Sequence, residues 1–162
     1  MRQVVGVMGS GDDGDAALLE QARQLGEAIA RRGWVLLNGG RASGVMDASA
    51  QGASAAGGLV VGVLPDDDAR RASSHLDVCI RTGRGDGRNV INVLSSDVVI
   101  ALQGGAGTLS EIALALNAGR TVICLDIDPG DAFRSFRKAG PLRFADTVES
   151  AVALAAEVLG AL

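Results

Sequence analysis

The sequence predicts an α/β protein: a single doubly wound parallel sheet in a Rossmann-like three-layer α/β/α domain that spans residues 1–162. Short apolar runs rich in Val, Ile and Leu alternate with segments of helical length, which is the pattern of buried parallel strands joined by helices. Glycine supplies 23 residues, which gather where apolar runs end, at about twice the usual roughly 7%. The length suits one hydrophobic core rather than two.

The first half of the chain alternates strands and helices. After the first strand, apolar residues recur at spacings of four, three and four from Leu18 to Ile29, so a helix is predicted that ends at Gly33. The next predicted helix is so rich in Ala and Ser that it must pack very closely. The elements predicted in this half are strands at 2–9, 34–37 and 59–64, the helix that ends at Gly33 and a helix at 45–56.

The second half repeats the alternation. Thr108 is predicted to be the N-cap of the central helix, which ends at Gly119, and Thr147 to be the N-cap of the last helix. The elements predicted in this half are strands at 77–80, 98–102, 121–126 and 142–145, a helix at 89–95, the helix after Thr108 and the helix after Thr147.

The carboxyl ends of parallel strands meet at one rim of such a sheet, where ligands usually bind. Four glycine-containing loops should therefore converge there, at 9–14, 38–44, 81–88 and 103–108. The first loop spells G-x-G-x-x-G, the dinucleotide pattern. Because Asp12 and Asp13 would face a pyrophosphate with like charge, we expect only a shorter phosphate or ribose contact in this loop, through Ser10 and Gly11.

The loop at 103–108 is the strongest candidate site. A β-branched strand runs into three closely spaced glycines and then a helix, so backbone N–H groups and the helix dipole would favour an anion. The alternative is an ordinary turn in which Thr108 and Glu111 form a capping box. The predicted contacts with a phosphorylated ligand are Gly9, Ser10, Gly39, Gly40, Arg88, Gly104, Gly105, Ala106, Gly107 and Thr108.

Arg88 stands where the helix at 89–95 begins. A cation at a helix N-terminus is unfavourable by a few tenths of a kcal/mol up to about 1 kcal/mol. A bound anion next to Arg88 would make the interaction favourable. The alternative is an exposed arginine whose unfavourable interaction with the helix is small.

Composition argues against several functions. A net charge of −4 with one Trp, three Phe and no Tyr is poor in what nucleic-acid binders use, so no nucleic-acid partner is expected. No apolar run reaches the length of a membrane span, and none resembles a signal peptide. We expect Cys79 and Cys124 to be buried and reduced in a cytoplasmic protein.

Metal and cofactor chemistry is equally restricted. Lys138 is the only lysine and lies in a basic amphipathic stretch that begins at Phe133, so neither a Walker A loop nor a pyridoxal enzyme is expected. Asp126 and Asp128 are better explained as loop residues than as metal ligands. No metal and no required cofactor are predicted.

Several motifs together resemble a known superfamily. G-S after the first strand, G-G-R-A-S-G-V-M, G-G-L-V-V-G-V-L-P, Arg88 and G-G-A-G-T-L-S-E follow the order seen in the Lonely Guy family, phosphoribohydrolases that activate cytokinins and were once misannotated as lysine decarboxylases. The resemblance covers nearly the whole chain. It would place a catalytic arginine at Arg88 and a catalytic acid at Glu111.

The departures from that family point to a sister branch. Gln103, Asn89, Asn92 and Ala106 replace a proline, a lysine, a methionine and an aromatic residue of the family motifs. The R-N-x-I-N-x-x-x-S-D string at 88–97 more closely resembles a branch that includes molybdenum cofactor carrier proteins, with a distant likeness to DNA-processing protein A.

This resemblance implies a homodimer that binds a nucleotide or a molybdopterin-type ligand. Two functions remain open. The protein holds such a phosphorylated ligand as a carrier, or it hydrolyses the N-glycosidic bond of a nucleoside 5′-monophosphate with Arg88 and Glu111.

Overall fold

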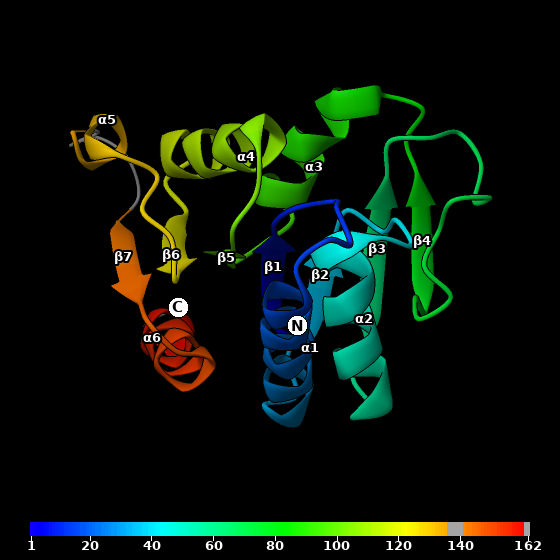
Figure 1. The fold of residues 1–162 in the computed structure, drawn as a ribbon, viewed down its shortest axis with the longest axis horizontal. Helices are drawn as coiled ribbons and strands as arrows, with labels where there is room; N and C mark the ends of the chain where they lie inside the picture. Colours follow the sequence, from blue (N-terminus) through cyan, green and yellow to red (C-terminus); the bar gives the residue numbers. More distant parts are fainter. Residues whose placement is uncertain (136–140, 161–162) are drawn as a thin grey trace.

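The computed structural model describes residues 1–135 and 141–160 (Figure 1). One sheet of seven parallel strands has the order β4-β3-β2-β1-β5-β6-β7, so the predicted doubly wound fold is confirmed. The strands are β1 (Val4–Met8), β2 (Val35–Asn38), β3 (Val60–Leu64), β4 (Val78–Arg81), β5 (Val98–Ala101), β6 (Thr121–Leu125) and β7 (Leu142–Ala145). The helices are α1 (Ala16–Arg31), α2 (Gly44–Ala55), the 3-10 turn η1 (Gly85–Gly87), α3 (Arg88–Leu94), α4 (Ala106–Asn117), α5 (Asp131–Arg134) and α6 (Val148–Gly160).

Helices cover both faces of the sheet. Figure 1 shows α1, α2 and α6 on one side and α3 and α4 on the other. Strand β5 serves both cores, because Val98 and Ile100 belong to the apolar cluster with α1 and α6, whereas Val99 and Ala101 belong to the cluster with α4. Alternating side chains of a strand point to opposite faces, so a continuous apolar run is the sequence of a strand covered twice.

The pair α1–α2 packs as closely as its small residues predicted. A Cβ atom at Gly26 would lie 2.0 Å from the Ser49 carbonyl oxygen, and one at Gly52 would lie 1.9 Å from the Arg23 carbonyl oxygen. Only glycine fits at either position. These contacts fix α2 against α1.

Strand β1 lies between β2 and β5, which makes the β1–β5 junction the point where the strand order reverses. The chain first builds β2, β3 and β4 on one side and then returns through α3 to β5. Ligands of doubly wound sheets bind in the crevice outside the carboxyl ends of the strands at such a point.

Predicted helix ends agree with the structure in three places. Gly33 and Gly119 follow α1 and α4 with φ angles of 74° and 75°, the left-handed conformation that ends many helices. The Thr147 hydroxyl accepts a hydrogen bond from the Ser150 N–H at 3.2 Å at the start of α6. The N-cap predicted for the central helix is wrong, since α4 begins at Ala106 and Gly105 is its N-cap.

The prediction that both cysteines are buried is correct for one of them only. Cys124 is buried in β6, but Cys79 is only half-buried because β4 is an edge strand with exposed neighbours. Lys138 lies outside the described residues. Within residues 1–135 and 141–160, no helix has the length and apolarity that crossing a membrane requires, and no three carboxylate, imidazole or thiol side chains gather as metal ligands.

Candidate functional site

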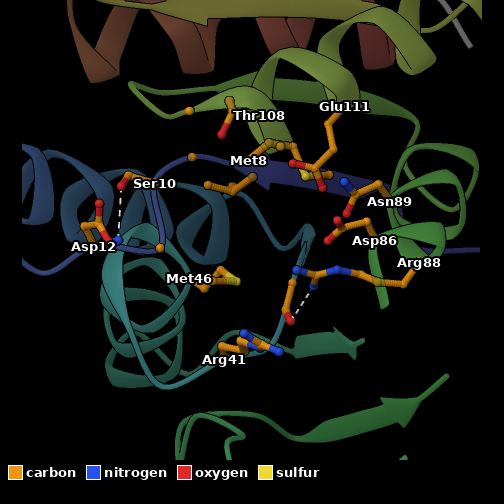
Figure 2. Close-up of a pocket in the computed structure, with 16 residues that line it drawn as sticks. Met8, Ser10, Asp12, Arg41, Met46, Asp86, Arg88, Asn89, Thr108 and Glu111 are labelled. Atoms are coloured by element: carbon orange, nitrogen blue, oxygen red, sulfur yellow. Dashed lines mark hydrogen bonds between the residues drawn. The ribbon is translucent and has the colours of Figure 1, made fainter. Parts of the chain in front are cut away.

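A pocket of about 330 Å³ lies at the carboxyl ends of the strands around the β1–β5 junction (Figure 2). Such a volume is at the lower end of the range for small-molecule sites. All four glycine loops contribute to the wall of the pocket. Of the predicted site residues, those that line it are Gly9, Ser10, Gly39, Arg88, Gly105, Gly107, Thr108 and Glu111; Gly40, Gly104 and Ala106 are not part of its wall.

The N-terminus of α4 faces this pocket and has no capping side chain. The N-cap Gly105 has no side chain, and among the described residues no hydrogen bond starts from the backbone N–H groups of Ala106, Gly107 or Thr108. The first N–H groups of a helix lack partners inside the helix, and the dipole adds a partial positive charge there. This end of the pocket is therefore suited to an anion such as a phosphate.

The glycines of this loop have different reasons to be glycine. A Cβ atom at Gly104 would lie 2.1 Å from the Thr108 hydroxyl oxygen, so internal packing excludes a side chain there. A Cβ atom at Gly105 or Gly107 would meet no atom of the described protein within 4 Å. The space in front of these two glycines is open to a ligand.

The loop after β1 supports the pocket from the other side. The Ser10 N–H donates to the Gln103 carbonyl oxygen at 2.8 Å, which joins this loop to the loop after β5. The Ser10 hydroxyl oxygen accepts from the Asp12 N–H at 3.0 Å, a bond drawn in Figure 2. The hydroxyl hydrogen of Ser10 remains available to a ligand.

The N-terminus of α2 is already occupied by the protein. Gly44 N–H donates to Asp13 Oδ1 at 2.6 Å, and Val45 N–H donates to the Ser10 carbonyl oxygen at 2.8 Å. A carboxylate and a carbonyl oxygen of the protein therefore already occupy the positions where an anion would bind at this helix N-terminus. The loop at 38–44 contributes to the wall of the pocket but offers no second helix N-terminus.

Arg88, the first residue of α3, reaches across to the ends of β2 and β3. Its Nη1 donates to the Gly39 carbonyl oxygen at 2.6 Å, a bond drawn in Figure 2, and to the Val63 carbonyl oxygen at 2.7 Å. Burial lowers the pKa of Arg88, while the Glu111 carboxylate acts in the opposite direction. Neither sequence-based explanation was complete, because internal carbonyl oxygens solvate this cation.

The same contact explains Gly39. A Cβ atom there would lie 2.2 Å from Arg88 Nη1. Gly39 is a glycine because the guanidinium occupies the space of its side chain. Gly39 and Arg88 thus form one structural unit at the wall of the pocket.

Glu111 projects from α4 into the pocket and is only 8% exposed. Its Oε1 accepts a hydrogen bond from Asn92 Nδ2 at 3.0 Å. Burial raises the pKa of Glu111, whereas the Asn92 bond and the Arg88 charge lower it. The capping-box alternative is wrong, because this carboxylate points to α3 and not back to the start of its own helix.

The sequence reasoning missed several lining residues. Arg41 lies in the loop at 38–44, for which only glycine contacts were predicted, and its position at the rim of the sheet is the sequence signal that identifies it. Asn89 shares one face of α3 with Asn92, and its Nδ2 donates to the Ser110 hydroxyl oxygen at 3.3 Å. Gly11, predicted with Ser10 as a ligand contact of the first loop, does line the pocket. The lining residues absent from the predictions are Val7, Met8, Asp12, Arg41, Met46, Asp86 and Asn89.

A doubly wound sheet with a pocket at its switch point and an uncapped helix N-terminus defines a Rossmann-like protein that binds small ligands. The chain belongs to the SLOG cluster4 family, whose model matches residues 2–152. An uncharacterized protein of Archaeoglobus fulgidus is 47% identical over 121 residues, 75% of this chain and 78% of that protein.

Named relatives divide between two activities. The chain is 43% identical over 99 residues, 60% of its length, to the cytokinin riboside 5′-monophosphate phosphoribohydrolase of Mycobacterium tuberculosis, of which the match covers 53%. The molybdenum cofactor binding protein of Rippkaea orientalis superposes with a TM-score of 0.93 at 43% identity over 98% of both chains. The molybdenum cofactor carrier protein of Chlamydomonas reinhardtii gives 0.91 at 40% identity over 99% of both chains.

Proposed function

We propose that the protein binds a small phosphorylated ligand, a nucleotide or a molybdopterin-type compound, and holds it without turning it over. The observation that carries this proposal is the uncapped N-terminus of α4, whose N–H groups face a pocket beside two glycines that no internal contact requires. The phosphate would accept hydrogen bonds from this end of the helix.

The chemical class of the ligand follows from what surrounds that end. Polar side chains from α3 and the strand ends supply donors and acceptors for the rest of the ligand, and a volume of about 330 Å³ suits a small molecule. The structural relatives that bind or carry the molybdenum cofactor favour a carrier. No resident cofactor is required for such a role.

Native mass spectrometry of freshly purified protein tests the proposal. We expect a bound phosphorylated compound that dissociates on denaturation and is identified by its mass. Protein that carries no ligand and binds neither adenosine monophosphate nor a pterin phosphate in titration calorimetry would contradict it.

A second candidate is a phosphoribohydrolase, favoured by the presence of Arg88 and Glu111 in one pocket. In that reaction the phosphate of a nucleoside 5′-monophosphate would sit at α4 and Arg88 would orient the ligand. The Glu111 carboxylate would stabilise an oxocarbenium-like state or activate water. Release of adenine from adenosine monophosphate, followed by chromatography and abolished in Glu111→Gln, would establish hydrolysis and replace the carrier proposal.

The protein is further proposed to be a cytoplasmic homodimer. Apolar side chains on α3 and α4 remain exposed next to the pocket: Val90 at 41%, Ile91 at 37%, Leu94 at 53% and Leu109 at 40%. A second copy packed on this face would bury them. Light scattering at micromolar concentration should give twice the mass of one chain, and Leu94→Asp should give a monomer.

A further inference from the structure

Arg41 is held at the wall of the pocket by the segment that follows β3. The Ala42 N–H donates to the Arg71 carbonyl oxygen at 2.9 Å, and the Ser73 N–H donates to the Gly40 carbonyl oxygen at 2.8 Å. Both hydrogen bonds attach the loop at 38–44 to that segment, immediately on either side of Arg41. The side chain therefore starts from a fixed point.

The Arg41 guanidinium is only partly used. Its Nη2 donates to both carboxylate oxygens of Asp66, at 3.2 and 3.3 Å. A fork-shaped pairing would engage two nitrogens, whereas here a single nitrogen serves both oxygens. Within the described residues, Nη1 forms no hydrogen bond and is not among the buried unpaired atoms, and Nε is buried without a partner.

Arg88 lies on the same wall in a similar state. Its Nη1 is bound to strand carbonyl oxygens, while among the described residues Nη2 has no partner and Nε is buried and unpaired. Burial lowers the pKa of Arg88 most, and the charge of Arg41 lowers it further against the opposing effect of Glu111. Two cations with unused donors on one wall of a pocket repel each other, and an anion between them would relieve that repulsion.

We infer that Arg41, together with Arg88, forms a second anionic subsite in the pocket, opposite the N-terminus of α4. Asp66 is a positioning residue that orients Arg41 by taking one of its nitrogens. The inference rests on the proposed function and specifies its ligand: one phosphate binds at α4, and a second anionic group binds at Arg41. A ligand with two phosphate groups should thus bind better than its counterpart with one.

The contributions of the two subsites to binding can be distinguished with three nucleotides: adenosine 5′-monophosphate, adenosine 5′-diphosphate and adenosine 3′,5′-bisphosphate. In calorimetry of the wild type, the affinity for at least one of the two nucleotides with two phosphate groups should be about tenfold or more above the affinity for the monophosphate. This ratio of affinities is expected for one added charged hydrogen bond. Arg41→Ala should abolish that ratio and change monophosphate affinity by less than about threefold. Asp66→Asn should reduce the ratio without abolishing it.

Arg71→Ala is the matched control, because Arg71 is an exposed arginine of the neighbouring segment and is not part of the pocket wall. It removes the same charge and should leave the ratio unchanged. Circular dichroism melts of each variant verify that the fold is intact.

The possible results distinguish a failure of the second subsite from a failure of the proposed function. Monophosphate binding with the same ratio in wild type and Arg41→Ala would overturn the second subsite and leave the proposed function standing. An equal loss for all three nucleotides in Arg41→Ala would also overturn it, since Arg41 would then act on the whole pocket. A wild type that binds none of the three would overturn both the subsite and the phosphate-binding function.

Discussion

The loops at 38–44 and 103–108 look alike in sequence and differ in structure. Each is a glycine-rich connection from a buried strand to a helix. At α2 the first N–H groups are taken by Asp13 and the Ser10 carbonyl oxygen. At α4 none of the N–H groups of Ala106, Gly107 and Thr108 has a partner among the described residues.

The glycines show the same contrast. Gly39, Gly40 and Gly44 are required by internal contacts or by φ angles of 74° and 58° at the last two. Gly105 and Gly107 have no such requirement. A glycine that the folded protein itself does not need is a better sign of a ligand than a count of glycines.

The largest effect should follow from a side chain in the first loop. In Gly44→Ala the Cβ atom would lie 2.2 Å from the Ser10 carbonyl oxygen, at a φ angle of 58°. Overpacking and backbone strain together should lower the free energy of unfolding by about 3 kcal/mol or more. Urea denaturation followed by circular dichroism measures this, and a variant within about 1 kcal/mol of the wild type would show that the loop relaxes.

Arg88→Ala should have the next largest effect, because it lowers both the stability of the protein and its affinity for the ligand. The Gly39 and Val63 carbonyl oxygens lose a charged donor, so the protein should be less stable. Affinity for a phosphorylated ligand should fall by roughly 1.5–3 kcal/mol if the guanidinium also contacts it. Arg84→Ala, an exposed arginine outside the pocket wall, should change neither quantity; equal losses in both variants would indicate a nonspecific charge effect.

Gly107→Ala, in the loop at 103–108, should change stability and ligand affinity in opposite directions. The new methyl group would meet no atom of residues 1–135 and 141–160 within 4 Å beyond its own helix backbone and chain neighbours, and alanine in a helix is favoured over glycine by about 0.5–1 kcal/mol. The variant should therefore be slightly more stable while its ligand affinity falls by about tenfold, or ~1.4 kcal/mol. Denaturation and calorimetry on the same sample test both signs, and unchanged affinity would remove Gly107 from the ligand site.

Most of the fold could be predicted because local patterns decide it. Apolar runs identified the central strands, which are covered on both faces, and also the edge strands β4 and β7, whose residues are mostly exposed or half-buried. The range predicted for the last strand, 142–145, is the one observed. Glycines in the left-handed conformation marked the ends of α1 and α4. These signals depend on residues within a few positions of one another.

The missed features depend on contacts between distant residues. Arg88 is solvated by the Gly39 carbonyl oxygen, 49 residues away in sequence, and Asp13 caps Gly44 from 31 residues away. The true N-cap of α4 is a glycine without a capping side chain, so the nearest threonine, Thr108, was chosen wrongly. A local pattern can indicate a loop but not what fills it.

The smallest effect on binding is expected from Glu111→Gln, and it tests the environment of the α4 end directly. Burial raises the pKa of Glu111 in the folded protein above its usual 4.5, so the folded state keeps this proton to a higher pH than the unfolded state does. Wild-type stability should therefore decrease as pH rises from about 4.5 through the raised pKa. Glutamine cannot ionise and can still accept the Asn92 hydrogen bond, so the variant should lack this decrease.

The measurement is urea denaturation of both proteins from about pH 4 to pH 8, with calorimetry of adenosine monophosphate binding at neutral pH. The stability difference in favour of Glu111→Gln should grow with pH, and affinity should change by less than about threefold because the phosphate binds at the helix N-terminus. Parallel pH profiles would mean that Glu111 is as solvated in the folded protein as in the unfolded chain. A large loss of affinity would instead place the ligand in direct contact with the carboxylate, and the distinction between the phosphate end and the Glu111 end of the pocket would fail.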